Sequence, residues 1–203
     1  MKLFHSPASP FVRKVVVLLH ELGKQDDVAL ATVTTTALAS DEALKAANPL
    51  ARLPALVRPD GGTLYDSRVI TAYLDDLYGG GFYPGTAARW DVLTLEATGD
   101  GIMDSAVSMV YEKRLRAEAQ QSNDWIEAQW GKVHRAIGVL NERWMSHLTA
   151  PVNMGQVSVA CALSYLDFRL DARNWRQGHE ALARWHADFE ARGSMQSTQP
   201  PAA

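Results

Sequence analysis

Cysteine is almost absent from this 203-residue chain, in which Cys161 is the single example. One cysteine excludes an internal disulfide and any zinc cluster built from several cysteines. The longest apolar stretches, near residues 15–19 and 157–163, are far shorter than the ~20 residues that span a membrane. No basic segment followed by an apolar one opens the chain, so we expect no signal peptide. Together these absences predict a cytoplasmic protein with no membrane partner.

Charge of one sign is not in excess either. The formal net charge is -3, and no basic run alternates with aromatic residues, so we expect no nucleic-acid partner. The six histidines are scattered and form no HExxH pair, so we expect no metal site. The hydrophobic content of 47% is typical of an ordinary globular protein, long enough for one large domain or two small ones.

The first part of the chain alternates strand and helix patterns. β-branched runs and turn residues indicate strands, and apolar residues at helical spacing indicate helices. The predicted order is β-α-β-α-β-β-α, with strands at 2–5, 28–33, 55–58 and 63–65 and helices at 10–22, 41–47 and 66–78.

The rest of the chain shows helical patterns only. Three glycines at 79–81, followed by Phe82, Tyr83 and Pro84, are typical of a linker. We therefore predict a first domain at 1–78, a linker at 79–85 and an all-helical domain at 86–203. The helices expected in this second domain are 87–115, 125–147, 157–172 and 179–191.

Ser9 precedes Pro10 at the predicted start of the first helix. Proline suits the first helical position because its missing N–H has no partner there, and serine is a preferred N-cap. The same hydroxyl lies beside unsatisfied N–H groups and the positive end of the helix dipole, which suits an anion such as a thiolate. The pattern alone leaves simple capping and anion binding both open.

Leu53-Pro54 stands at the start of the third predicted strand. Because proline cannot donate a backbone hydrogen bond, it must lie at a strand edge or a bend. A cis bond would turn the N–H and C=O of Leu53 outward to pair with an extended peptide ligand, whereas a trans bond would place the proline at an edge strand. Arg52 adds a cation suited to a carboxylate, although a lone arginine is usually a solvated surface residue.

Asp66 and Ser67 stand at the start of the helix predicted to end near residue 78. We expect Ser67 to be the N-cap and the helix end to offer N–H groups to a carboxylate. Asp66 lies one residue earlier and could face an ammonium group. The pair could therefore hold both charges of an amino-acid head group, with capping alone as the other interpretation.

Taken jointly, these stretches resemble the glutathione transferase family over nearly the whole chain. The resemblance rests on the segments SPASPFVRKV, NPLARLPAL, YDSRVITAYLDD and EALARWHADFEAR. The chain is most similar to small bacterial serine-type members with the N-terminal motif Ser-Pro-Phe-Val-Arg-Lys, here residues 9–14. The resemblance implies an α/β plus all-α fold, with a thioredoxin-like N-terminal domain followed by a helical-bundle C-terminal domain.

The resemblance also implies a glutathione site. In that site Pro54 follows a cis bond, and Leu53 pairs with the cysteinyl backbone of glutathione. Asp66 and Ser67 hold the γ-glutamyl group, and Arg52 lies where the family often places a basic residue near the glycine carboxylate. Glutathione is therefore the expected co-substrate, and no metal is expected.

Ser9 lies where serine-type members place the hydroxyl that faces the thiol. We expect it to donate a hydrogen bond to sulfur, because the sequence positions no His–Asp pair that would make it a nucleophile. The expected enzyme is a glutathione S-transferase acting on a small hydrophobic electrophile, by conjugation or peroxide reduction. The alternative is a non-catalytic binding or regulatory protein with the same fold. Cys161 lies in an apolar helix and is expected to be buried and inert.

Two positions depart from the family pattern. The helix expected at 157–172 normally begins with a Ser/Thr-x-x-Asp capping box, but here Ser158 is followed three residues later by Cys161. Its start must therefore be stabilised in another way. Arg68 also departs from the usual run after the serine and adds charge near the site.

The co-substrate pocket is expected between the domains. Met103, Val107 and Tyr111, spaced four residues apart, are its candidate lining, although such a stripe is also typical of core or dimer packing. Relatives usually form two-fold dimers, so we expect a homodimer. We expect Asp100 and Asp104 to be solvated carboxylates, with contact to the glutathione ammonium across a dimer interface as the alternative.

Overall fold

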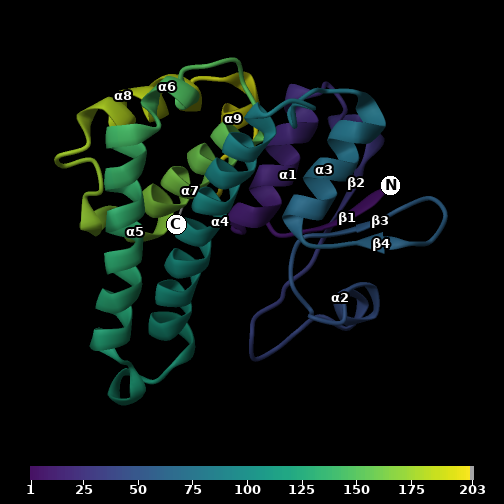
Figure 1. Ribbon diagram of the computed structural model, residues 1–203. Helices are drawn as coiled ribbons and strands as arrows, with labels where there is room; N and C mark the ends of the chain where they lie inside the picture. The colour runs from purple at the N-terminus through teal and green to yellow at the C-terminus, as the bar shows by residue number, and fades with distance from the viewer. Residues whose placement is uncertain (202–203) are drawn as a thin grey trace. The chain divides into compact units, whose positions relative to one another are not determined.

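The computed structural model describes residues 1–201 and divides the chain into two compact units (Figure 1). The first unit holds Met1–Tyr83 together with the residues from Gly193 onward, and the second is Pro84–Arg192. The range 86–203 expected for the helical domain differs from this division at its end. The last residues group with the first unit for the structural reason given below.

A four-stranded mixed sheet is the framework of the first unit. Its strands are β1 (Lys2–His5), β2 (Ala29–Thr32), β3 (Ala55–Val57) and β4 (Thr63–Leu64), in the order β2-β1-β3-β4. β1 is parallel to β2 and antiparallel to β3, and β3 is antiparallel to β4. Because successive side chains of a strand point to opposite faces, the buried Leu3 and Phe4 serve two separate cores.

Three helices cover the two faces of this sheet. α1 (Pro10–Glu21) and α3 (Ser67–Tyr78) pack against each other on one face, and α2 (Glu42–Ala47) lies on the other (Figure 1). Leu44 of α2 joins Phe4 and Ala55 in the second core. A short 3-10 turn, η1 (Gln25–Asp27), precedes β2. The order β-α-β-α-β-β-α confirms the predicted thioredoxin-like arrangement.

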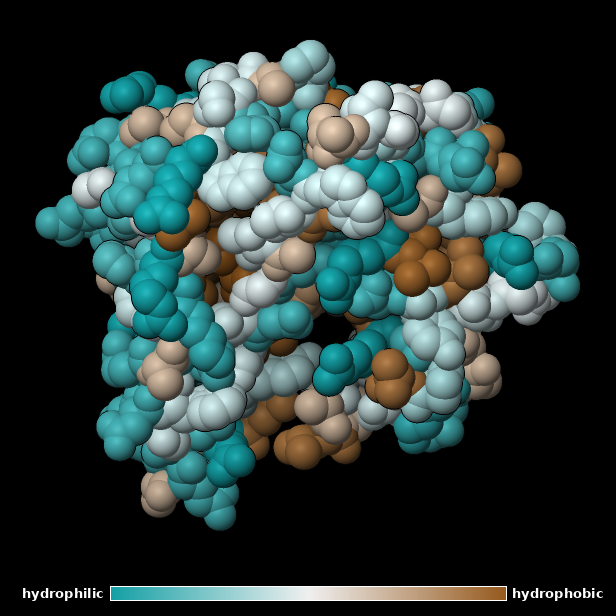
Figure 2. All heavy atoms as spheres, viewed as in Figure 1, coloured by the Kyte–Doolittle hydropathy of each residue, from teal (hydrophilic) through white to brown (hydrophobic). Residues whose placement is uncertain are grey.

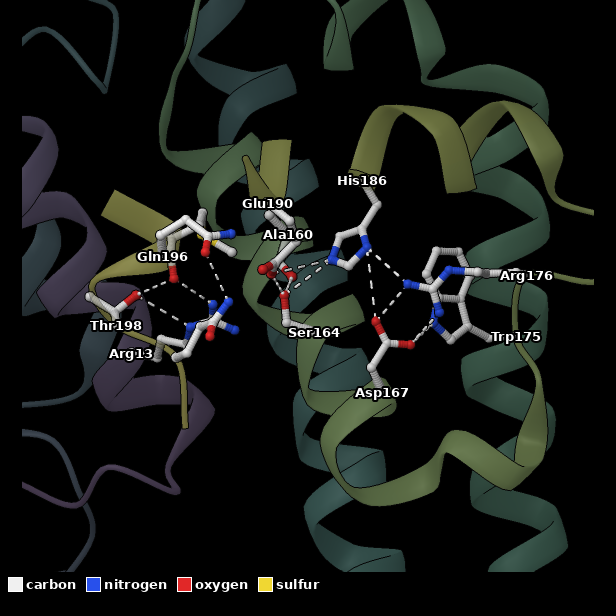
Figure 3. Close-up of polar contacts among 12 residues, drawn as sticks. Arg13, Ala160, Ser164, Asp167, Trp175, Arg176, His186, Glu190, Gln196 and Thr198 are labelled. Carbon is white, nitrogen blue, oxygen red and sulfur yellow. Dashed lines mark hydrogen bonds and ion pairs between the residues drawn. The ribbon is translucent and has the colours of Figure 1, made fainter. Parts of the chain in front are cut away.

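The end of the chain returns to α1. α9 (Gly193–Gln196) packs on α1, where the guanidinium of Arg13 donates from Nη2 to the Met195 carbonyl at 3.1 Å and from Nε to Thr198 Oγ1 at 3.4 Å (Figure 3). Ser194 Oγ donates to the Glu21 carboxylate at the other end of α1. Met195 is fully buried in this contact. These buried contacts explain why the segment belongs to the first unit.

The second unit is built from helices throughout. Its long helices are α4 (Ala88–Leu115), α5 (Asn123–Arg143), α7 (Met154–Leu170) and α8 (Glu180–Glu190), and its short ones are α6 (Met145–Leu148), η2 (Glu118–Gln120) and η3 (Asp171–Arg173). α4 and α7 lie close together at Gly99, where an added Cβ would lie 2.7 Å from the carbonyl carbon of Ser158. Cys161 is buried in α7, as expected.

α7 begins at Met154, earlier than the predicted residue 157. Asn153 is its N-cap, and its Oδ1 accepts hydrogen bonds from the N–H groups of Gly155 and Gln156 at 3.0 and 3.3 Å. The Gln156 side chain lies 3.0–3.1 Å from three carbonyls of the preceding loop. Asparagine therefore stabilises the helix start that the missing capping box had left open.

Ser158 consequently lies inside α7 rather than at its start. Its hydroxyl contacts the Glu96 carbonyl at 3.1 Å and Asp100 Oδ1 at 3.2 Å. Asp100 is 4% exposed, so the expectation that it is a solvated carboxylate is wrong. Asp104, one turn later on α4, is exposed.

The face drawn in Figure 2 is mostly hydrophilic, with hydrophobic residues in separate small groups. Some large apolar side chains are well exposed, for example Leu38 at 77% and Trp90 at 70%. Within residues 1–201, none of the helices combines the length and the apolar character needed to cross a membrane.

Candidate functional site

Ser9 is the N-cap of α1. Its Oγ accepts a hydrogen bond from the Val12 N–H at 3.4 Å, and Pro10 occupies the first turn as the sequence indicated. The Ser9 N–H donates to the Ser6 carbonyl at 3.0 Å, which fixes the approach to the helix. A hydroxyl that accepts one bond still has its own proton to donate. Ser9 is half-buried, so this proton can serve a ligand at the positive end of α1.

His5 ends β1 four residues before Ser9. Burial lowers the pKa of its imidazole below the ordinary 6.5, and its Nδ1 lies 3.4 Å from Thr32 Oγ1. The ring is therefore neutral at pH 7. The charge that favours an anion near the start of α1 thus comes from the helix end and not from this histidine.

A second element of the site is the loop between α2 and β3, which Asn48 shapes. Asn48 is 1% exposed, and its Nδ2 donates to the Arg52 carbonyl at 2.8 Å while its Oδ1 accepts from the Leu50 N–H at 3.0 Å. Its own carbonyl accepts from the Ala51 N–H at 2.8 Å. In the sequence, the one signal for Asn48 is the Asn-Pro pair in NPLARLPAL, which indicates a turn but not the partners of the side chain.

This loop presents the backbone of Leu53. The Leu53–Pro54 peptide bond is cis, and Pro54 is buried. Within the described part of the chain, neither the N–H nor the C=O of Leu53 takes part in a hydrogen bond. One donor and one acceptor of the main chain are therefore available to a peptide-like ligand. The side chain of Arg52, next to it, is exposed.

The third element is the start of α3, where the structure corrects the expected cap. Asp66, not Ser67, is the N-cap, and its Oδ1 accepts from the Arg68 N–H at 3.0 Å. Its Oδ2 lies 3.3 Å from Arg68 Nη2, so Arg68 partly neutralises the carboxylate that faces the helix end. The Tyr65–Asp66 peptide bond is also cis.

Ser67 is the first residue of α3 and is only 2% exposed. Its hydroxyl forms no hydrogen bond to any residue in the range 1–201. The hydroxyl oxygen is not fully enclosed, so a ligand can reach it. A nearly buried hydroxyl is normally hydrogen-bonded. A polar ligand at the start of α3 would supply the missing partner.

The sheet register brings these three elements to one edge. Phe4 near the end of β1 is paired with Ala55 at the start of β3, so the loop that follows β1 and the Leu53-Pro54 segment lie at the same edge. Leu64 at the end of β4 is paired with Leu56, so the chain enters α3 from that edge too. At this edge lie Ser9, which follows β1, Leu53, which precedes β3, and Ser67, which follows β4.

The predicted stripe on α4 divides into core and surface. Met103 is fully buried in the helical unit, so it offers no surface to a ligand and its assignment to a co-substrate pocket is corrected to a core position. Val107 is half-buried, and Tyr111 is 37% exposed. Spacing of four residues identifies a helix face but not whether that face meets a core or a ligand.

A hydroxyl, an imidazole and a carboxylate also meet between α7 and α8 (Figure 3). Ser164 Oγ lies 3.1 Å from His186 Nε2, and His186 Nδ1 lies 4.0 Å from Asp167 Oδ2. This order is that of a serine nucleophile and its base. However, Ser164 and His186 are 7% and 2% exposed, so no substrate reaches them.

Residues 1–201 also hold no group of three or more metal-ligating side chains.

Two family models match the chain: the glutathione S-transferase N-terminal domain over residues 3–82 and its C-terminal domain over residues 123–188. A protein of Escherichia coli (strain K12), described as the uncharacterised GST-like protein YibF, is 32% identical over the full length of both chains. The chain belongs to the glutathione S-transferase family.

Solved structures of this family superimpose closely on the chain. A family member from Pseudomonas fluorescens Pf-5, crystallised with bound glutathione, has a TM-score of 0.97 and 46% identity over 99% of each chain. A glutathione S-transferase from Methylobacillus flagellatus KT, also with glutathione bound, has a TM-score of 0.85 and 34% identity over 98% of each chain. The fold of this glutathione S-transferase family member is therefore the one the sequence predicted.

Proposed function

We propose that this chain is a glutathione transferase that holds glutathione on its thioredoxin-like unit and activates the thiol at Ser9. The observation that carries the proposal is the Ser9 hydroxyl, which caps α1 and keeps a proton to donate at the positive end of the helix. The thiolate then attacks a small hydrophobic electrophile, with conjugation or peroxide reduction as the reaction.

The remaining groups at the sheet edge match the parts of glutathione. The unpaired N–H and C=O of Leu53, before the cis Pro54, suit the cysteinyl backbone. The Ser67 hydroxyl and the start of α3 suit the γ-glutamyl carboxylate, and Asp66 suits the ammonium group. The exposed Arg52 suits the glycine carboxylate.

The magnitudes are sufficient for thiol activation. A free thiol has a pKa of about 8.5, so about 3% is thiolate at pH 7. Lowering that pKa by about two units requires about 2.7 kcal/mol. A hydrogen bond to a charged acceptor supplies about 1.5–3 kcal/mol, and a helix end supplies about 0.3–1 kcal/mol. Ser9 and α1 together therefore provide the required stabilisation without a metal.

The electrophile is proposed by class. A Pseudomonas fluorescens Pf-5 family member, 44% identical to this chain with a TM-score of 0.93, was crystallised with S-(propanoic acid)-glutathione. That ligand is a conjugate of glutathione with a short carbon chain, which is consistent with conjugation to small electrophiles. Val107 and Tyr111 of α4 retain accessible surface and stay candidates for contact with the electrophile.

The assembly, domain ranges and location are also proposals. Apolar side chains as exposed as Trp90 are consistent with a homodimer, because large exposed apolar groups often mark interfaces. We propose the domain ranges 1–78 and 86–203, except that the segment from Gly193 groups with the first domain. A cytoplasmic location is consistent with a single, buried cysteine.

Substitution of Ser9 by alanine tests the proposed role directly. We expect Ser9→Ala to lower the turnover of glutathione with an activated aryl halide by about 10- to 100-fold, because it removes about 1.5–3 kcal/mol from the thiolate. The affinity for glutathione, measured by calorimetry, should change by less than about threefold, since the other contacts persist.

Ser6→Ala is the matched control, because Ser6 lies in the same loop and contacts Ser9 only through its backbone carbonyl. It should keep full turnover. Equal turnover of Ser9→Ala and the unmodified protein would contradict the proposed role of Ser9. Glutathione binding without turnover on aryl halides, disulfides and peroxides would favour the non-catalytic binding protein instead.

A further inference from the structure

Five polar residues form a group, called here the His186 cluster, where α8 packs on α7; Ser164 and His186 are buried, Asp167 and Glu190 are partly buried, and Arg176 is exposed. Ser164 and Asp167 come from α7, His186 and Glu190 from α8, and Arg176 from the loop before α8 (Figure 3). The His186 ring is 2% exposed and lies edge-on to the Trp175 ring, with a centroid distance of 5.6 Å. All of these residues belong to the second unit, and none is used by the proposed reaction.

The proton positions in the cluster follow from counting donors. Ser164 has one hydroxyl proton, and both the Glu190 carboxylate and the Ala160 carbonyl, at 2.8 Å from Ser164 Oγ, accept only. The proton is therefore committed to one of these oxygens. The contact of 3.1 Å between Ser164 Oγ and His186 Nε2 then requires the imidazole to donate. His186 must carry a proton on Nε2.

The other ring nitrogen must be an acceptor. Arg176 Nη2 lies 3.4 Å from His186 Nδ1, and a guanidinium can only donate. Nδ1 therefore carries no proton, and the ring is the neutral Nε2–H tautomer. The result is a chain of hydrogen bonds in one direction, from Arg176 through His186 to Ser164, whose proton goes on to Glu190 or to the Ala160 carbonyl. It joins the loop before α8, α8 itself and α7.

We infer that the His186 cluster is a proton-sensitive contact that holds α8 on α7 at neutral pH and loosens in mild acid. A second proton would enter at Nδ1, where it opposes the Arg176 donor and places two cations beside the same Asp167 carboxylate. Asp167 is already held by both guanidinium nitrogens of Arg176 and by Trp175 Nε1 at 2.8 Å. Arg176 must then give up its contact with the ring.

The charged groups facing His186 come from each neighbouring element. Asp167 on α7 and Glu190 on α8 favour the imidazolium, Arg176 opposes it, and burial opposes it most. The net effect is that the pKa of His186 is lowered from 6.5 in the folded protein. A histidine with a lowered pKa contributes stability that is fully present above about pH 6.5 and is lost as the pH falls toward the folded-state value.

Nuclear magnetic resonance of the unmodified protein with ¹⁵N-labelled histidine tests the tautomer. We expect the His186 ring to show the Nε2–H tautomer at pH 7.5 and to titrate with a pKa below the ordinary histidine value of 6.5, because burial opposes its charged form. An Nδ1–H tautomer, or a His186 pKa at or above 6.5, would overturn the inference.

Urea unfolding tests the consequence for packing. All six tryptophans lie in the second unit, so their fluorescence reports its unfolding. The ratio of folded to unfolded protein should fall by up to about tenfold per pH unit below pH about 6.5, because one proton is taken up on unfolding. His186→Gln keeps a donor near the Nε2 position but cannot titrate, so it should lose this component of the pH dependence.

His134→Gln is the matched control, since His134 is an exposed histidine of the same unit. It should keep the pH dependence of the unmodified protein. If both variants retained the same dependence, His186 would not be the responsible group. If His186→Gln failed to fold, the tautomer and pKa measured on the unmodified protein would still decide the question. Neither measurement involves glutathione, so the outcome is independent of the proposed enzymatic function.

Discussion

Asn48 connects two ends of the loop that presents Leu53. Its side-chain amide forms hydrogen bonds with the Arg52 carbonyl at 2.8 Å and with the Leu50 N–H at 3.0 Å. Asn48 itself is only 1% exposed. Ala51, between these partners, has a φ of 51°, a left-handed conformation that is unfavourable for alanine. Asn48 therefore holds a strained loop whose shape determines where the Leu53 backbone lies.

Asn48→Ala should destabilise this loop and weaken glutathione binding together. Removing two buried hydrogen bonds should lower the free energy of unfolding by about 1–3 kcal/mol, measured by urea titration with circular dichroism. The affinity for glutathione should fall several-fold in calorimetry, because Leu53 loses its support.

Leu50→Ala provides the comparison in the same loop. Leu50 is 65% exposed, so its truncation should change stability by less than about 0.5 kcal/mol. Loss of stability in Asn48→Ala without any loss of glutathione affinity would show that the loop does not position Leu53 for the ligand.

Single residues also mark the limit of sequence reasoning. The sequence predicts Ser9 as an N-cap because serine is a preferred cap and the next residue, Pro10, suits the first helical position. At the start of α3, Asp66 and Ser67 are both good caps, and only the backbone path decides that Asp66 is the one. Met103 was misassigned because helical spacing does not distinguish a core from a pocket. Asn48 was missed because its partners depend on the path of the loop.

At the scale of elements, the packing of α4 on α7 depends on glycine. A Cβ at Gly99 would lie 2.7 and 2.8 Å from the carbonyl carbon and oxygen of Ser158, closer than any stable contact. Both atoms belong to the α7 backbone and cannot rotate away. The two helices would have to separate to admit even one methyl group.

Gly99→Ala should therefore destabilise the helical unit by about 1–3 kcal/mol, as overpacked cores generally do. Urea unfolding followed by tryptophan fluorescence measures this change. Gly101, in the same helix, has nothing within 4 Å of its added Cβ, so Gly101→Ala should stabilise the unit by about 0.5–1 kcal/mol. A loss of stability in both variants would point to a general intolerance of α4 rather than to the contact with α7.

Most elements could be predicted, but not all of their ends. The helix and strand patterns predicted the types and order of elements because apolar spacing differs between them. The sequence pattern places the start of α7 three residues late, because its apolar run begins at residue 157, while the actual cap is Asn153. The structure shows that Ser158 contacts α4, a tertiary role that no local pattern reveals.

For the whole molecule, the sequence predicts an α/β unit followed by an all-helical unit, and the structure has this order. The sequence does not predict that α9 packs back on α1. α9 and Thr198 pack on α1 through Arg13, which lies about 180 positions away in the sequence. Contacts over such separations leave no periodic signal in a single sequence. The segment also connects the end of the chain to the helix that carries Ser9.

The proposed reaction requires glutathione to be held as a thiolate against the start of α1. Ultraviolet absorbance of the thiolate, followed as a function of pH with saturating glutathione, measures this directly. We expect the bound thiol to have a pKa about two units below the value of about 8.5 for a free thiol, and Ser9→Ala to raise it again by at least one unit. A bound thiol with the pKa of free glutathione, or an equal pKa in both proteins, would contradict the account.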